Sequence, residues 1–169
     1  MSLVKPGRVL CLVAALFTAI PGAAEVEAAA DLALEANAAR VVTYVRNARW
    51  ERVDNGNPGP GIGDLVLGSG DLSRGRGGLV RDTQEWSSVV TKIDFQTGRE
   101  LRSATVQYTW RKGSILTEKI ASFPINGGLN DSVTYAVVGG TGDYAGARGT
   151  ARLKVLNERE FRVVFDLLP

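Results

Sequence analysis

The chain has 169 residues, the length of about one domain, and carries 20 Lys and Arg against 18 Asp and Glu, with no histidine and one cysteine. Without histidine, a Ser-His-Asp triad and a zinc site built on histidine are both excluded. The near balance of charges offers no basic face of the kind that nucleic-acid binding requires, so we expect no nucleic-acid partner.

The first segment of the chain, residues 1–30, has the features of an export signal. Lys5 and Arg8 precede an apolar run, VLCLVAALFTAI, and small residues follow it in PGAAEVEAAA. A basic head, a short apolar core and small residues are typical of a signal peptide, and the run is too short to span a bilayer comfortably. We therefore expect a secreted or periplasmic protein that has no membrane contact after cleavage.

Two positions, after Ala24 and after Ala30, fit the expected cleavage. We expect a flexible leader over residues 31–39 and a folded domain over residues 40–169. Cleavage removes Cys11, the only cysteine. Disulfides, thiol nucleophiles and cysteine-based metal sites are then excluded from the mature domain, and we expect no metal there.

From residue 40 onward, apolar and polar residues alternate, and clusters of Gly, Pro and Asn interrupt the alternation. Alternation with a period of two predicts strands, and the clusters predict turns. The segment QTGR between two such runs is a good hairpin signal. The eight predicted strands are residues 40–53, 64–72, 83–95, 100–110, 114–123, 132–138, 150–156 and 160–168.

No helical segment separates the predicted strands, so the sheet should be antiparallel and the fold all-β. Eight antiparallel strands in a chain of this size suit an up-and-down barrel or a sandwich. We expect the eight-stranded up-and-down barrel, whose interior is just wide enough for side chains or one small ligand. In the last strand, Phe161 and Phe165 fall on the face that should point inward.

A glycine-rich stretch, AVVGGTGDYAGARG, covers residues 136–149 and fits the G-x-G-x-x-A pattern of dinucleotide loops. Such a loop must open a helix whose N-terminus receives the pyrophosphate. Here further glycines and a strand-like alternation follow instead of a helix. The stretch therefore predicts a structural turn and not a nucleotide-binding loop. The residues of this structural turn are Gly139, Gly140, Gly142, Tyr144, Gly146 and Gly149.

Three stretches, in this order, resemble the allene oxide cyclase and dirigent families. The segment GDLV, residues 63–66, resembles the second-strand entry of allene oxide cyclases, and Asp71 stands where dirigent proteins carry a pocket aspartate before leucine. The segment RKGSILTEKIAS, residues 111–122, resembles the dirigent "GSTL" strand. The segment VVGGTGDYAGARGTA resembles their glycine turn, with Tyr144 at the aromatic position. The spacing of Asp54, Gly61, Gly63 and Asp64 is similar to that of bacterial allene-oxide-cyclase-like barrels.

The resemblance implies a closed eight-stranded barrel, usually trimeric, around an apolar cavity and with no cofactor. Val164 and Leu168 also make the outer face of the last strand partly apolar, so we expect a homo-oligomer, either a trimer or a dimer. Allene oxide cyclases close a ring on a fatty-acid epoxide, dirigent proteins steer the coupling or cyclisation of phenolic intermediates, and related bacterial barrels direct cycloadditions. In each case the barrel holds a reactive molecule in one productive conformation. Two positions depart from the family patterns. Val45 replaces the glutamate of the cyclases, and Lys119 or Ile120 replaces a late glycine of the dirigent strand.

Two residues are candidates for catalysis. A carboxylate of Asp71 at the barrel mouth would protonate an intermediate or stabilise positive charge, although aspartate also commonly starts turns. The hydroxyl of Tyr108 would act as an acid or hydrogen-bond donor, and its ordinary pKa near 10 makes it a poor base. Trp110 lies two residues from Tyr108, so both side chains face the same side of the predicted strand.

Aromatic residues on the predicted strands are candidates for ligand binding, because large flat side chains inside a small barrel would grip an unsaturated molecule. The alternative for each is simple core filling. These candidates are Trp50, Trp86, Trp110 and Tyr135. Three strand charges, Glu85, Glu118 and Arg102, would need a partner if they point inward and would then be functional, whereas outward charges only face solvent.

Three functions fit these observations. The first is a cofactor-free cyclase, isomerase or stereo-directing barrel that acts on a reactive apolar molecule. The second is a lipocalin-like carrier or sequestering protein for an apolar ligand, and the third is an interaction protein with a filled core. A cavity with an ionisable group would favour the first, a wholly apolar cavity the second, and a packed interior the third.

Overall fold

A computed structural model describes residues 39–56, 58–125 and 130–169. The predicted export signal and all but the last residue of the predicted leader lie outside these ranges. Within the described ranges, we find no helix whose length and hydropathy would let it cross a bilayer.

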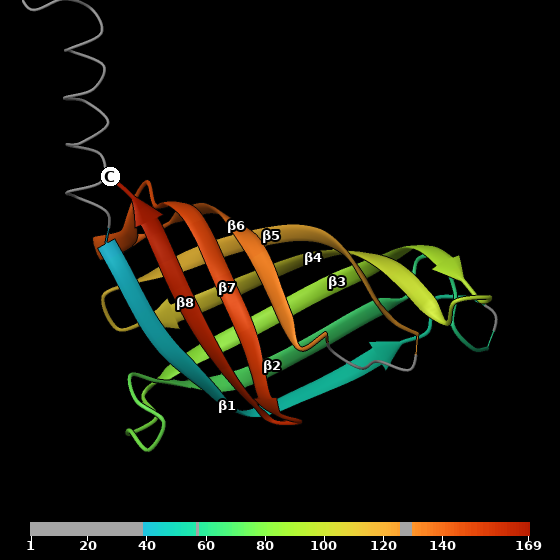
Figure 1. Ribbon diagram of the computed structural model, residues 1–169, viewed down its shortest axis with the longest axis horizontal. Helices are drawn as coiled ribbons and strands as arrows, with labels where there is room; N and C mark the ends of the chain where they lie inside the picture. Colours follow the sequence, from blue (N-terminus) through green and yellow to red (C-terminus); the bar gives the residue numbers. More distant parts are fainter. Residues whose placement is uncertain (1–38, 57, 126–129) are drawn as a thin grey trace, which may run out of the picture.

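Eight antiparallel strands form a closed barrel in which each strand pairs with its neighbours in the sequence and the last pairs with the first (Figure 1). This confirms the predicted fold class, and no strand end differs from its predicted position by more than two residues. The strands are β1 Ala39–Val53, β2 Leu65–Ser73, β3 Asp82–Asp94, β4 Arg99–Trp110, β5 Gly113–Pro124, β6 Ser132–Gly140, β7 Arg148–Asn157 and β8 Glu160–Leu168.

The first strand belongs to two parts of the barrel. Its first half pairs with β8, from Ala39 opposite Leu167 to Val45 opposite Phe161, and closes the barrel. A register shift lies between Arg46 and Arg49 in the pairing with β2, with Asn47 at a φ of 52°. Such a bulge bends the strand, and asparagine tolerates this left-handed conformation better than most residues. After the bulge, β1 pairs only with β2.

A second separation of strands occurs between β5 and β6. These strands pair only where Ile115–Glu118 faces Ala136–Gly140, and the rest of β5 continues without β6. The second half of β1, with β2, β3, β4 and β5, therefore projects beyond β6, β7 and β8 (Figure 1). We call this projecting part of the sheet the extension.

Aromatic rings fill the opposite end of the barrel. The ring of Tyr108 stands edge-on to Phe165 at 4.9 Å between centroids, and Trp110 lies 5.7 Å from the same ring. Phe161 and Phe165 are both buried, as the alternation in the last strand predicts. Edge-to-face pairs of this kind each contribute about 0.5–1.5 kcal/mol beyond the burial of their area. This end of the barrel is therefore a packed core.

The glycine-rich stretch turns the chain over this packed end. Gly142–Tyr144 form one short 3₁₀ turn between β6 and β7, and no α-helix follows. Gly142 has a φ of 59°, and a Cβ there would lie 2.1 Å from the carbonyl oxygen of Lys112, so only glycine fits. The ring of Tyr144 packs on Trp110 at 5.1 Å. The stretch thus makes a turn that closes the end of the barrel, without the helix that a dinucleotide loop needs.

Candidate functional site

The barrel interior contains a cavity of about 50 Å³ between the packed end and the extension. At about 10–15 Å³ for each water molecule, it has room for about four waters, and it is about one third of the roughly 150 Å³ of an engineered apolar cavity that binds benzene. Ten residues line it: Gln84, Trp86, Ser88, Arg102, Ala104, Val106, Phe123, Tyr135, Leu153 and Phe161.

The space exists because small side chains meet at the middle of the sheet. Ser88 of β3 lies directly opposite Ala104 of β4, and one step further along the same face Trp86 lies opposite Val106. Both strands point every second residue into the barrel, so small and large side chains alternate along the wall. Serine and alanine leave a gap that the larger residues border.

The indole of Trp86 lies directly over Gly68 of β2, its neighbour across the strands. A Cβ on Gly68 would lie 2.0 Å from two ring carbons of Trp86, so any side chain at this position would displace the ring. The missing side chain lets the indole sit against the backbone of β2 and form one wall of the cavity.

A network of four charged side chains lies on the inner face of the extension. The guanidinium of Arg52 donates from Nε to Asp64 at 2.9 Å, and from Nη1 and Nη2 to both oxygens of Glu100 at 3.2 and 3.0 Å. It also donates to the carbonyl of Ile125 at 3.2 Å. Arg102 donates from Nε to the same Glu100. Arg52 thereby ties β1 to β4 and to the end of β5.

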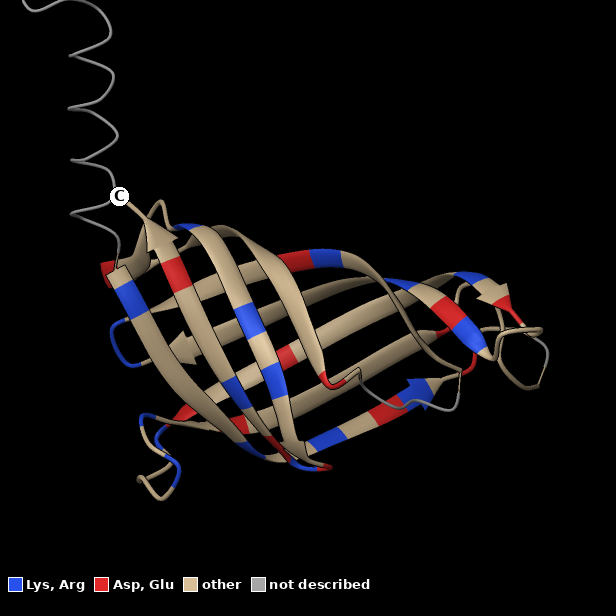
Figure 2. Ribbon diagram, viewed as in Figure 1, with Lys and Arg blue, Asp and Glu red and all other residues tan. Residues whose placement is uncertain are grey.

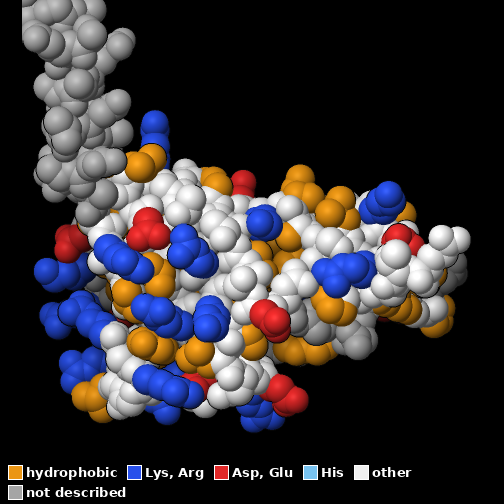
Figure 3. Space-filling view, viewed as in Figure 1, with side chains coloured by type: hydrophobic (Ala, Val, Ile, Leu, Met, Phe, Trp, Pro, Cys, Tyr) orange, Lys and Arg blue, Asp and Glu red, His pale blue; other side chains and the backbone are white. Residues whose placement is uncertain are grey.

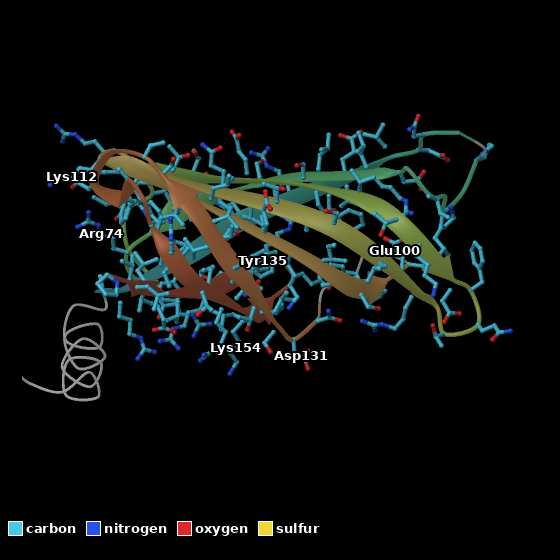
Figure 4. All side chains as sticks on the ribbon, turned by 90° about the horizontal axis from the view of Figure 1, so that it is seen from above. Arg74, Glu100, Lys112, Asp131, Tyr135 and Lys154 are labelled. Carbon is cyan, nitrogen blue, oxygen red and sulfur yellow. The ribbon has the colours of Figure 1, made fainter. Side chains whose placement is uncertain are left out.

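These charges differ from most others in the molecule. Figure 3 shows Lys and Arg side chains spread over one outer face, where they meet solvent, whereas Asp64, Glu100 and Arg102 are at most 3% exposed. Figure 2 shows bands of both signs on the extension, and Figure 4 shows Glu100 there, with Tyr135 nearer the middle of the barrel. Two arginines and two carboxylates balance, so the network is formally neutral.

The surroundings of Asp64 fix its ionised form. Burial raises the pKa of this carboxyl, but hydrogen bonds from the amides of Gly61 and Asn55 and from Arg52 outweigh burial and lower the pKa below its ordinary value. In the same way, burial lowers the pKa of Arg52, and its bonds to Glu100 and Asp64 outweigh that effect and raise it. The pair therefore stays charged at neutral pH.

Arg102 connects the network to the cavity. Its Nε and Nη2 point to Glu100 and to the carbonyl of Pro124, the latter at 3.4 Å, and its guanidinium carbon lies 5.0 Å from the centre of the Phe123 ring. No acceptor among the described residues reaches its Nη1. Because Arg102 also lines the cavity, it brings a cation to an otherwise mostly apolar wall.

Polar groups elsewhere in the interior are held neutral. Burial raises the pKa of Tyr135, which lines the cavity, to about 12, despite the opposing effect of Arg102. Burial also raises the pKa of Tyr108 well above its ordinary value. The Tyr108 hydroxyl and the side-chain carbonyl oxygen of Gln84, its neighbour across the strands, have no hydrogen-bond partner among the described residues. Neither tyrosine can serve as a base near neutral pH.

Three of the residues singled out in the sequence meet at the cavity. Trp86 and Tyr135, candidates for ligand binding, line it, and Arg102 is the one of the three considered strand charges that points inward. Glu85 and Glu118 are exposed on the outer face.

The structure places the other candidates away from the cavity wall. Asp71, proposed as a catalytic acid at the mouth, lies on the outer face because its neighbours Gly70 and Leu72 point inward, and it accepts a hydrogen bond from Asn47 at 2.7 Å. Tyr108 and Trp110 are buried in the packed aromatic end. Trp50 shares the inner face with Trp86 across Gly68, but it is 51% exposed and does not line the cavity.

Sequence reasoning missed Glu100, Arg52 and Gln84. The sequence did contain a signal for Glu100, because it lies two and four residues before Arg102 and the inward-facing Ala104 and therefore on the same face of the strand. Nothing local marks Arg52 as its partner, since the two are 48 residues apart. In the described part of the chain, no group of three or more His, Cys, Asp or Glu side chains is placed to hold a metal ion.

No protein-family model and no curated protein matches the chain. Several solved structures are similar to it. The chain is similar to a pyocyanin demethylase, with a TM-score of 0.62 and 22% identity over 76% of this chain and 99% of the other. It is also similar to a pterocarpan synthase dirigent protein, with a TM-score of 0.52, 16% identity and coverage of 78% and 86%. A third similar structure is the Diels-Alderase AbmU from Streptomyces koyangensis, with a TM-score of 0.55, 18% identity and coverage of 85% and 73%.

The chain has the barrel fold of these proteins. The resemblance to the allene oxide cyclase and dirigent-like barrels is thereby confirmed for the fold. Identities this low carry no residue roles from one protein to another, so the function has to be argued from the cavity itself.

Proposed function

We propose that this barrel binds a small unsaturated molecule in its interior cavity and directs the cyclisation, isomerisation or stereoselective coupling of that molecule without a cofactor. The observation that carries the proposal is the presence of Arg102, a buried cation, in a cavity wall made largely of Trp86, Phe123, Tyr135 and Phe161. A purely apolar lining would suit storage alone, whereas a fixed charge can act on a reacting molecule. A dirigent protein and a Diels-Alderase among the similar structures are consistent with this chemistry.

The chemical contribution of such a site is mainly orientation. Aromatic faces on several sides leave a flat ligand few ways to lie, and reacting atoms held in contact gain an effective molarity on the order of 10⁵ M or more. The network behind Arg102 fixes the guanidinium before a ligand arrives, so little reorganisation is needed during the reaction. A small preformed cavity therefore suffices for a reaction that needs no external reagent.

The alternative is a non-catalytic carrier or sequestering protein for an apolar ligand. The observation that favours it is the neutral state of the polar side chains in the wall. Tyr135, with its pKa near 12, neither gives nor takes a proton readily at neutral pH. The two functions share the cavity and differ only in whether the ligand leaves unchanged.

Filling the cavity tests both versions. Ala104 lines the cavity, and Ala104→Phe should abolish the binding of xenon, measured by ¹²⁹Xe NMR, while Ala136→Phe on the exposed face of β6 should leave it intact. Mass spectrometry of extracts from the purified protein should recover a small unsaturated ligand. If the wild-type barrel binds no xenon and yields no ligand, the proposal is wrong.

Incubation of a recovered ligand with fresh protein separates the enzyme from the carrier. Cyclisation or isomerisation leaves the mass unchanged and alters the chromatographic retention and the conjugated absorbance. A carrier returns the ligand with both properties as they were.

Export remains part of the proposal and rests on the basic head and apolar run of residues 1–30. Expression of the full chain in a bacterial host should yield a protein whose measured mass corresponds to cleavage after Ala24 or Ala30. An uncleaved chain that stays in the cytoplasm would contradict export.

A further inference from the structure

The connection between β2 and β3 combines positive charge with exposed apolar side chains. Its sequence, RGRGGLVR over residues 74–81, contains three arginines and no acidic residue (Figure 2). Between the arginines, Leu79 is 77% exposed and Val80 is 41% exposed. Single apolar side chains scattered over a surface need no explanation, but these two are adjacent and stand beside charges. We call residues 74–81 the basic loop.

The barrel holds the basic loop in place. A hydrogen bond of 2.9 Å between backbone groups of the loop closes a turn within it. Arg46 of β1 donates from Nη1 to the carbonyl of Gly78 at 3.4 Å, and Arg76 lies 3.7 Å from Glu160 at the start of β8. The loop is therefore fastened to two strands, while its apolar pair stays exposed.

More positive charge adjoins the basic loop. The amide of Arg111, in the turn between β4 and β5, donates to the carboxylate of Asp82 at 3.1 Å, so this turn lies beside the end of the loop. The side chains of Arg111 and Lys112 are both exposed. Figure 4 shows Arg74 and Lys112 at one end of the molecule and Glu100 toward the other.

This end of the barrel differs in charge from the extension. The basic loop and the connections 111–112 and 141–147 together carry five Lys and Arg and one Asp. The connections 54–64 and 95–98, at the extension, carry two Asp and no Lys or Arg. A negatively charged surface should therefore attract the end of the barrel that carries the basic loop.

The arginines of the loop are available to such a surface. Among the described residues, no carboxylate lies within salt-bridge distance of Arg74 or Arg81. The pair of Arg76 with Glu160 is long, and the arginine side chain is 69% exposed, so another anion can replace the glutamate at little cost. A guanidinium can donate two parallel hydrogen bonds to one phosphate. The loop thus offers phosphate-binding groups beside an apolar pair.

From this combination we propose that the basic loop docks the barrel on an anionic phospholipid bilayer. Leu79 and Val80 enter the boundary between headgroups and acyl chains, and the three arginines bind headgroup phosphates. A soluble polyanion would occupy the arginines and leave the apolar pair without a role. The inference goes beyond the proposed function and does not depend on it.

The sequence led us to expect no membrane contact after cleavage. Hydropathy marks long apolar segments, and an apolar pair within a loop gives no such signal. The exposure of the pair and its place among the arginines come from the structure.

Cosedimentation with lipid vesicles tests the docking. The purified protein should bind vesicles of phosphatidylcholine with phosphatidylglycerol at least about 10-fold more tightly than vesicles of phosphatidylcholine alone. Each arginine near an anionic surface contributes about fivefold, so replacing all three should weaken binding about 100-fold. Leu79→Ser should weaken it about 10-fold, because it removes the more exposed apolar side chain. The arginine substitutions are Arg74→Gln, Arg76→Gln and Arg81→Gln.

Matched variants separate the loop from overall charge and from exposure. All variants share residues 1–38, so a difference in binding reports the barrel. Removing three exposed charges from strands should weaken binding by less than about 10-fold, because salt screens charges that stand more than about 8 Å from the bilayer. Phe95→Ser, at a side chain 72% exposed beside β3 in the extension, should bind like the wild type. The strand substitutions are Lys92→Gln, Arg152→Gln and Lys154→Gln.

A nitroxide spin label measures the depth of the loop. In a Cys11→Ser background, a label on Leu79→Cys should become protected from a water-soluble nickel chelate and accessible to oxygen when anionic vesicles are added. A label on Phe95→Cys should show no change. Light scattering checks that Leu79→Ser has the molar mass of the wild type.

Four results would overturn the proposal. They are equal losses of vesicle binding in the two triple variants, an unchanged label at Leu79, a loss of heparin binding but not of vesicle binding in the loop variants, and an altered molar mass of Leu79→Ser. The third result would assign the loop to a soluble polyanion, and the fourth would assign the apolar pair to a contact between copies of the chain. Xenon binding should be the same in all loop variants, so none of these results removes the cavity function.

Discussion

Replacing Glu100 with glutamine removes one of the two carboxylates that balance the buried Arg102 and the partly exposed Arg52 in the extension. Breaking a buried ion pair on one side costs about 3–5 kcal/mol, because the remaining charge loses its partner. A barrel of about 130 residues has an unfolding entropy of about 0.27 kcal/mol/K. Glu100→Gln should therefore lower the midpoint of thermal unfolding by about 11–18 °C, followed by circular dichroism and checked by urea unfolding.

Two comparisons show whether charge is the cause. Glu118→Gln makes the same chemical change at an exposed position of β5 and should change the unfolding free energy by less than about 0.5 kcal/mol. The double variant Glu100→Gln with Arg102→Met removes the uncompensated cation and should recover part of the loss, because Arg52 keeps Asp64. If Glu100→Gln unfolds at the same temperature as Glu118→Gln, the network does not stabilise the extension as described.

Three further predictions follow from groups already described. The pKa of Asp64 is lowered in the folded state, so its contribution to stability is present above about pH 4 and is lost as the pH falls further. In Asp64→Asn, the free energy of unfolding should therefore fall less steeply below about pH 4 than in the wild type. Because the pKa of Tyr135 is raised to about 12, the folded state holds a proton that the unfolded chain releases near pH 10. Stability should therefore fall as the pH rises from about 10 to about 12, and less so in Tyr135→Phe, measured by urea unfolding. Gly68→Ala should displace Trp86, cost about 1–3 kcal/mol and shift the tryptophan emission.

The substitution of Gly68 has a matched control in the chain. Gly139→Ala, where a Cβ would meet nothing within 4 Å, should fold and emit like the wild type. Equal effects of Gly68→Ala and Gly139→Ala would mean that the indole does not rest on Gly68.

The strands were predictable because their signals are local. In β4, alternation from Glu100 to Trp110 marks one face as apolar over most of its length, and glycine and proline clusters mark where strands stop. The same alternation in β2 places Gly70 and Leu72 on the inner face. The outward position of Asp71 could therefore have been predicted from the sequence.

The cavity and the charged network were not predictable in the same way. Arg52 meets Glu100 only because the second half of β1 bends at Asn47 and continues along β2, and that bend has no clear sequence signature. The room beside Ser88 likewise depends on Trp86 resting over Gly68, which lies 18 residues earlier in the chain. Contacts between distant segments decide both features, and periodicity within one strand carries no information about them.

The pairing of β1 with β8 has a consequence for how the protein is made. The seam joins Ala39–Val45 to Phe161–Leu167, which is nearly the full span of the folded domain, so the barrel cannot close until the last strand has left the ribosome. Until then, the edges of β1 and β7 carry unpaired backbone groups that can pair with other chains. Truncation before Phe161 should therefore produce aggregation rather than a smaller soluble barrel, and folding should be slow for a protein of this length.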